Sequence, residues 1–139
     1  MYNRSVDISD RSTRDNGKIN IAGTDKGSVT TAINATAATA TSAEIDCQKY
    51  NGILLNMEGS LESDQTWIVE ILGCAVTGGN VGKSYYQDFE QKITITYADL
   101  LTDGVVNFTC PGVQNYVKIR ATLSGGTAAL TVRVTPVNL

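Results

Sequence analysis

The reactive side chains of this 139-residue chain exclude several kinds of catalysis. The sequence contains no histidine. Ser-His-Asp and Cys-His nucleophile systems both need an imidazole to take the proton of the nucleophile, and many metal sites need it as a ligand. Three cysteines, Cys47, Cys74 and Cys110, lie within or beside apolar stretches and form no Cys-x-x-Cys pair. We expect buried thiols, with a disulfide from Cys110 to Cys47 or Cys74 as an open alternative.

Carboxylates are the remaining candidates for acid–base chemistry, since a suitably spaced pair can hydrolyse a glycosidic bond. Most of them fall in predicted loops or on the polar faces of predicted strands: Glu58, Glu62, Asp64, Asp88, Glu90, Asp99 and Asp103. Glu70 instead interrupts an apolar run, which favours an ion-pair partner over a catalytic acid. Asp99, Asp103 and Asn107 do not have the spacing of a calcium loop. We predict no enzymatic activity, no cofactor and no metal.

Residues 78–84 end in Gly-Lys-Ser, as a phosphate-binding loop does. The first glycine of that motif would fall at Thr77, and no helix-forming run follows Ser84. The pattern therefore predicts an ordinary turn.

Aromatic residues suggest a second kind of binding site. Tyr85 and Tyr86, with Tyr50 or Trp67, are candidates for a platform that stacks on sugar rings. Adjacent residues of a strand point to opposite faces, so one of the two neighbouring tyrosines is expected in the core. A carbohydrate-binding module is an alternative function on this basis.

The elements that position these residues are predicted to be β-strands. Apolar side chains take the odd positions of residues 117–123 and the even positions of residues 130–134, with Ser124-Gly125-Gly126-Thr127 between them. A period of two is typical of a strand with one buried face, and two glycines suit a tight turn. We therefore expect the chain to end in an antiparallel hairpin.

Similar short alternating runs recur from residue 43 onward, with a turn signal every 8 to 14 residues. One helical turn is expected near residues 97–101. About eight strands predict an all-β fold, an antiparallel β-sandwich of the jelly-roll or immunoglobulin-like kind. The predicted core residues are large apolar side chains on these strands: Trp67, Ile71, Ile95, Phe108, Ile119, Leu130 and Val132.

Composition indicates one folded domain preceded by a polar arm. The chain is 42% hydrophobic and only 18% charged, which indicates a globular protein, and 139 residues suffice for a single core. Residues 1–30 show no periodicity, and residues 28–42 are a Thr/Ala-rich segment. We assign residues 1–41 to an extended N-terminal arm and residues 42–139 to the sandwich.

Charge and hydropathy bear on partners and location. A net charge of −3 with scattered basic residues argues against a nucleic-acid partner. No run approaches the length of a membrane span, and the N-terminus has no apolar signal core. We expect a protein made in a cytoplasm, with no membrane partner.

The segment Tyr116-Val117-Lys118-Ile119-Arg120-Ala121-Thr122-Leu123-Ser124-Gly125-Gly126-Thr127 resembles the closing strand and turn of small bacteriophage virion proteins. The resemblance implies a non-enzymatic structural component of a phage particle, a capsid decoration or cement protein located on the virion. It implies the major capsid protein or other virion proteins as partners, and a homo-oligomer, with a trimer favoured by the symmetry of icosahedral lattices. A phage tail or head–tail connector protein is the alternative.

The arm carries the residues predicted to bind a partner. Opposite charges can pair across an interface, and the apolar pair can add a strand to the exposed sheet edge of a neighbour. These partner-binding candidates are Asp7, Asp10, Arg11, Arg14, Lys18, Ile19 and Ile21.

Overall fold

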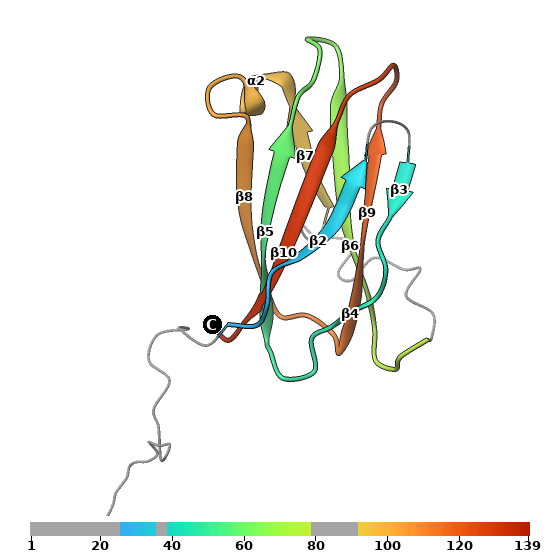
Figure 1. Cartoon of the computed structure of the whole chain (residues 1–139), viewed down its shortest axis with the longest axis vertical. Coiled ribbons are helices and arrows are strands. Elements are labelled where there is room, and N and C mark those ends of the chain that lie inside the picture. The colour runs from blue at the N-terminus through green and yellow to red at the C-terminus, as the bar shows by residue number, and fades with distance from the viewer. Residues whose placement is uncertain (1–25, 36–38, 79–91) are drawn as a thin grey trace, which may run out of the picture.

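Two antiparallel sheets packed face to face make up the computed structural model, which describes residues 26–35, 39–78 and 92–139 (Figure 1). The first sheet has the strand order β2-β10-β5-β8: β2 Thr30–Ala35, β10 Leu130–Val137, β5 Gly52–Gly59 and β8 Val105–Pro111. The second has the order β3-β9-β6-β7, with β4 also paired to β9: β3 Thr39–Thr41, β9 Tyr116–Leu123, β6 Thr66–Cys74, β7 Lys92–Thr96 and β4 Ile45–Asp46. The prediction of an all-β antiparallel sandwich is confirmed.

The strand order distinguishes between the two predicted kinds of sandwich. Apart from the short strand β4, each sheet holds four of the described strands, and the chain crosses between the sheets at almost every connection of these strands. Among the described strands other than β4, only β6 and β7 follow one another in the same sheet. This interleaving of two four-stranded sheets is that of an eight-stranded jelly roll rather than an immunoglobulin domain.

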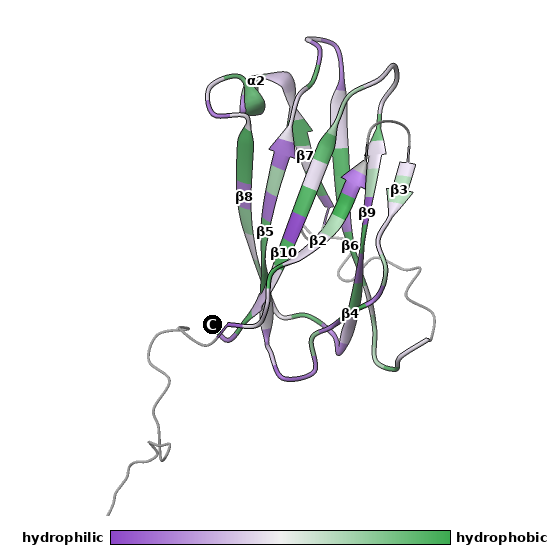
Figure 2. Ribbon diagram, in the orientation of Figure 1, coloured by the Kyte–Doolittle hydropathy of each residue, from purple (hydrophilic) through white to green (hydrophobic). Residues whose placement is uncertain are grey.

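The predicted terminal hairpin is wrong. β9 pairs with β3, β4 and β6, whereas β10 pairs with β2 and β5 in the other sheet. Hydrophobic and hydrophilic residues alternate along β10 (Figure 2). As the alternation predicted, β9 and β10 each bury one face, but the two strands lie in opposite sheets instead of side by side. The connection between Leu123 and Leu130 must therefore span the ~10 Å between the sheets.

Side chains from both sheets fill one core. Six of the seven predicted core residues are at most 1% exposed; the exception, Phe108, is half-buried. Its strand, β8, lies at the edge of its sheet, where among the described strands only β5 covers it. Trp67 is fully buried, and its indole Nε1 has no hydrogen-bond partner among the described residues.

The N-terminal boundary of the sandwich lies earlier than the sequence indicated. β2 and β3 fall within the Thr/Ala-rich segment that was assigned to the arm, and both are paired into the sheets. Ile33 is 2% exposed, so this segment contributes to the core. The β-branched threonines favour strands. Pairing with β10 and β9 orders this segment, which its low-complexity composition did not predict. Within the described residues, the earliest pairing is the β-bridge of Lys26 with Val137.

The short helix and the cysteines agree with the sequence. α2 (Tyr97–Leu100) occupies the position of the predicted helical turn, between β7 and β8. All three cysteines are thiols, with Cys47 and Cys110 buried and Cys74 half-buried. Burial raises the pKa of the Cys47 thiol to about 11, with a smaller contribution from the charge of Asp46.

Candidate functional site

The carboxylates considered for acid–base chemistry do not converge. Glu62 and Asp64 are exposed in the loop between β5 and β6, and Asp103 is exposed after α2. Asp99 accepts hydrogen bonds from the backbone N–H and hydroxyl of Thr96, at 2.8 and 2.9 Å, which hold its pKa below the usual value. Asp88 and Glu90 lie outside the described residues. In the described ranges, no group of three or more potential ligands is placed to hold a metal ion.

Glu70 is an ion-pair partner, as its position predicted. It lies between Arg120 of β9 and Lys92 of β7, directly opposite each in register. Arg120 Nη2 is 2.6 Å from Glu70 Oε1, and Lys92 Nζ is 3.5 Å from Glu70 Oε2. Burial opposes ionisation of Glu70, but the hydrogen bond and charge of Arg120, together with Lys92, outweigh it and lower its pKa. The charge is satisfied within the sheet, which indicates a structural role.

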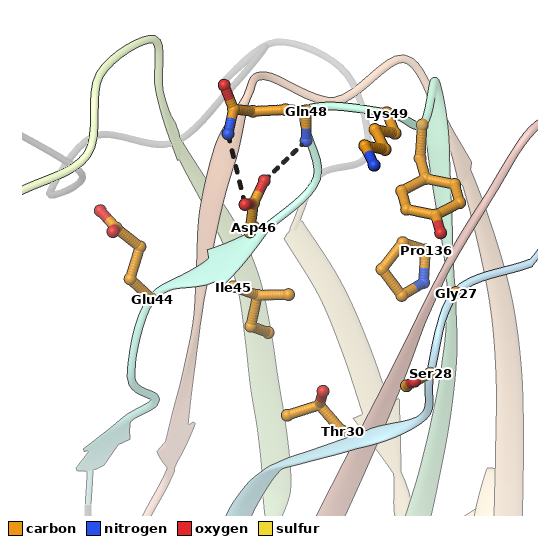
Figure 3. A pocket seen from close by; sticks show the side chains of 10 residues that line it. Gly27, Ser28, Thr30, Glu44, Ile45, Asp46, Gln48, Lys49 and Pro136 are labelled. Atoms are coloured by element: carbon orange, nitrogen blue, oxygen red, sulfur yellow. Dashed lines mark hydrogen bonds between the residues drawn. The ribbon is translucent and has the colours of Figure 1, made fainter.

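A groove of about 460 Å³ opens where the first sheet faces β4, beside Gly27 and Ser28 (Figure 3). It is lined by Gly27, Ser28, Thr30, Glu44, Ile45, Asp46, Gln48, Lys49, Tyr50 and Pro136. Sequence reasoning missed this groove, because its residues come from three separate parts of the chain. It contains two carboxylates, one ammonium group and one aromatic ring. Whether the groove could bind a ligand or catalyse a reaction depends on whether these polar groups are already engaged.

Both carboxylates of the groove are held by their own chain. Asp46 accepts hydrogen bonds from the backbone N–H of Gln48 at 2.9 Å and from its side-chain amide at 3.3 Å (Figure 3). Glu44 accepts from the Thr77 hydroxyl at 2.6 Å and from the Gly78 N–H at 3.0 Å, which lower its pKa. An acid–base pair would need one carboxyl group to hold a proton near neutral pH. These contacts favour a structural use of both acids.

The outer face of the first sheet carries a row of polar side chains across three strands. Arg133 of β10, Asn56 of β5 and Asn107 of β8 are direct neighbours in register. Arg133 Nη1 donates to Asn56 Oδ1 at 3.2 Å, and Asn56 Nδ2 donates to Asn107 Oδ1 at 2.9 Å. Arg133 also contacts Glu58 at 2.8 Å. The row ends at the edge strand β8, where the amide nitrogen of Asn107 has no acceptor in the described part of the chain.

The edge strand β8 has few of the features that prevent a sheet from pairing with another chain. Native edges are commonly short, charged, bulged or interrupted by proline. β8 is seven residues long, contains no charged residue and has its single proline at its last position, Pro111. The other described edges are each short or modified: β3 and β4 have three and two residues, β7 begins with Lys92, and the pairing of β2 with β10 is irregular at Val132/Arg133.

The two sides of the sandwich also differ. β2 contacts β3 and β9, which closes one side. On the opposite side, α2 contacts both β7 and β8 at one end of the molecule (Figure 1). Below it, Ile93 of β7 and Val106 and Phe108 of β8 are only half-buried against the core. β8 thus has an outer backbone edge that no described strand pairs with, beside half-buried apolar side chains.

The remaining predicted site residues are distributed as follows. The seven partner-binding candidates of the arm, Tyr85, Tyr86 and residues 79–84 all lie outside the described residues. Trp67 is fully buried and cannot stack on a sugar, while Tyr50 packs its ring over Gly27 at the groove. An aromatic platform from Trp67 is thereby excluded.

Comparisons with known proteins leave the family open: no family model, no curated protein and no solved structure matches this chain. No helix of the described ranges has the length and apolar character needed to cross a membrane. The case for a function therefore rests on the sequence and the geometry above.

Proposed function

We propose that this protein is a non-enzymatic structural component of a bacteriophage particle that decorates and stabilises the capsid shell. The observation that carries the proposal is the β7/β8 side of the sandwich, where no described strand pairs with the outer edge of the uncharged seven-residue strand β8. An unprotected strand edge promotes aggregation of an isolated protein, whereas in a protein that assembles it can pair with a strand of a partner. The eight-stranded jelly roll is a fold that viral capsid domains use, which supports the same class by analogy.

The resemblance to virion proteins involves a central part of this fold. Its residues form β9, in the interior of the second sheet, and the start of the connection that leads to β10 in the first. The expected partners are the major capsid protein or other virion proteins, and the N-terminal arm is the expected attachment element. Lys26, the first described residue, forms a β-bridge with Val137, the last residue of β10.

Particles that lack this protein provide the test. Purified full-length protein is added to them, and bound protein is measured by co-sedimentation. We expect saturable binding of the native chain and weaker binding of the arm variant Arg11→Glu/Arg14→Glu at an unchanged melting temperature. Lys49→Glu, on the sandwich surface, is the control and should bind as the native chain does. Failure of the native chain to bind, and its absence from purified virions, would overturn the proposal.

The absence of catalysis is part of the proposal. Single substitution of Glu70, Asp88, Asp99 or Asp103 by alanine is expected to alter stability at most. A hydrolytic activity abolished by one of these changes would contradict it. Titration against glycans examines the carbohydrate-binding alternative, and the location of the protein in the particle separates a shell protein from a tail or connector protein.

A further inference from the structure

We propose that residues 18–22 of one copy of this chain add as a strand to the outer edge of β8 in another copy, with Asn20 beside Asn107. The inference deepens the proposed function, because it names a second copy as a partner of the β7/β8 side. It rests on four observations: the unpaired edge, the apolar spacing, the polar row and the reach of the arm.

The main-chain groups of β8 provide the first observation. Among the described strands β8 pairs only with β5, in a register that runs from Gly52↔Pro111 to Glu58↔Val105. The N–H and C=O groups that point away from β5 are therefore available along Val105 to Thr109. Backbone hydrogen bonds to an added strand do not depend on side chains. β8 contains no charged residue, and its single proline is its last residue, Pro111, so neither feature prevents pairing along the rest of the strand.

Side-chain spacing identifies the occupant. Residues 18–22 read Lys-Ile-Asn-Ile-Ala, with Ile19 and Ile21 two positions apart. In an added strand both isoleucines point to one face, and Val106 and Phe108 of β8 likewise share the inward face. Placing the isoleucines beside these half-buried side chains covers apolar surface that the sandwich alone leaves accessible.

The same register continues the polar row. With Ile19 and Ile21 beside Val106 and Phe108, Asn20 falls beside Asn107 whether the added strand runs parallel or antiparallel. Asn107 already accepts a hydrogen bond from Asn56 through its carbonyl oxygen, and its amide nitrogen faces no described acceptor. The carbonyl oxygen of Asn20 can accept from it, which extends the row from Arg133 across a fourth strand.

The reach of the arm requires the acceptor to be a different copy. Lys26 pairs with Val137 on the side of β10 away from β5. A strand added outside β8 lies four strand spacings from Lys26, about 19 Å. Ala22 is four residues before Lys26, and four extended residues span at most ~14 Å. A chain therefore cannot place its own residues 18–22 there.

Donation of an arm from one copy to the edge of the next is a head-to-tail contact, in which two different surfaces meet. Such contacts close into a ring when the rotation between copies permits, and otherwise continue as a filament. A closed ring is consistent with the expected trimer, and every subunit in it has its β8 edge covered.

Disulfide trapping tests the contact in purified full-length protein. We expect a heterodimer when Asn20→Cys protein is mixed with Asn107→Cys protein and oxidised. The control replaces Asn20→Cys by Asn16→Cys, which lies in the same arm outside the proposed strand. The native cysteines are common to both mixtures. Equal cross-linking in the two mixtures, or a cross-link only within one chain of the double variant, would overturn the proposal.

Sedimentation provides an independent readout. Because successive N–H groups of a strand point to opposite edges, either Asn20→Pro or Ile21→Pro must remove a donor to β8, and we expect at least one to weaken self-association about tenfold. Asn16→Pro should associate as the native chain does. A native protein that is monomeric at all concentrations, or three indistinguishable proline variants, would contradict the inference. These experiments contain no particles, so their failure is distinguishable from a failure of shell binding.

Discussion

Glu70 and Arg120 lie directly opposite each other on β6 and β9, and the guanidinium Nη2 of Arg120 is 2.6 Å from Glu70 Oε1. The Glu70 side chain is 13% exposed, so water competes little for this contact. Lys92 approaches the second carboxylate oxygen from the other side. Three neighbouring strands of the second sheet are thus connected through one carboxylate.

Replacing Glu70 by glutamine should destabilise the protein by about 1–3 kcal/mol, because it leaves the half-buried Arg120 without its charged partner. The matched control is Glu58→Gln, whose contact with Arg133 joins two more exposed side chains and should contribute less than about 1 kcal/mol. Urea unfolding followed by the fluorescence of Trp67, the single tryptophan, measures both values. Equal losses in the two variants would contradict this role of Glu70.

The same ion pair predicts a pH dependence. The pKa of Glu70 is lower in the folded protein than its ordinary value of 4.5, so the folded state binds this proton more weakly than the unfolded state. Its contribution to stability is fully present above the unfolded pKa and is lost as the pH falls through the folded pKa. The difference in unfolding free energy between the native protein and Glu70→Gln should therefore be constant at neutral pH and shrink in acid. A difference that persists unchanged in strong acid would show that the ion pair is not its source.

Gly126 should tolerate alanine less well than Gly78. Both have positive φ angles, +72° and +67°, which cost a residue with a side chain about 1 kcal/mol or more. A Cβ at Gly126 would also collide with the side-chain amide of Gln65, whereas a Cβ at Gly78 would meet open space. Gln65 is buried and holds the β5–β6 loop through the N–H of Glu62. Thermal unfolding of both variants should show the larger loss for Gly126→Ala.

The three thiols should differ in reactivity. Cys74 is half-buried, while Cys47 and Cys110 are at most 2% exposed, and the raised pKa of Cys47 leaves little thiolate near neutral pH. A colorimetric thiol reagent at pH 8 should titrate Cys74 first in the folded protein and all three cysteines in denaturant. Cys74→Ser is the control, and it should leave only slow labelling in the native state. Rapid labelling of Cys47 in that variant would show that its burial is incomplete.

Local pattern was sufficient to predict the strands from residue 43 onward that the structure describes, but not β2 and β3 in the Thr/Ala-rich segment. Alternation at residues 117–123 and 130–134 identified both strands and the face that each buries, because a side-chain period of two is a property of a single strand. The interruption of an apolar run by Glu70 likewise indicated a paired charge, since an unpaired charge there would be costly.

The tertiary structure alone determined the partners of these strands and residues. Alternation specifies a buried face but not what packs against it, so β9 and β10 were expected in one hairpin and instead belong to opposite sheets. The ion-pair partners of Glu70 are set by the register between β6 and its neighbours β7 and β9, which are distant in sequence. Phe108 has a core-like sequence context and yet is half-buried, because its strand is at an edge. Position within a sheet arises from long-range pairing, and a pattern confined to a few neighbouring residues carries no information about it.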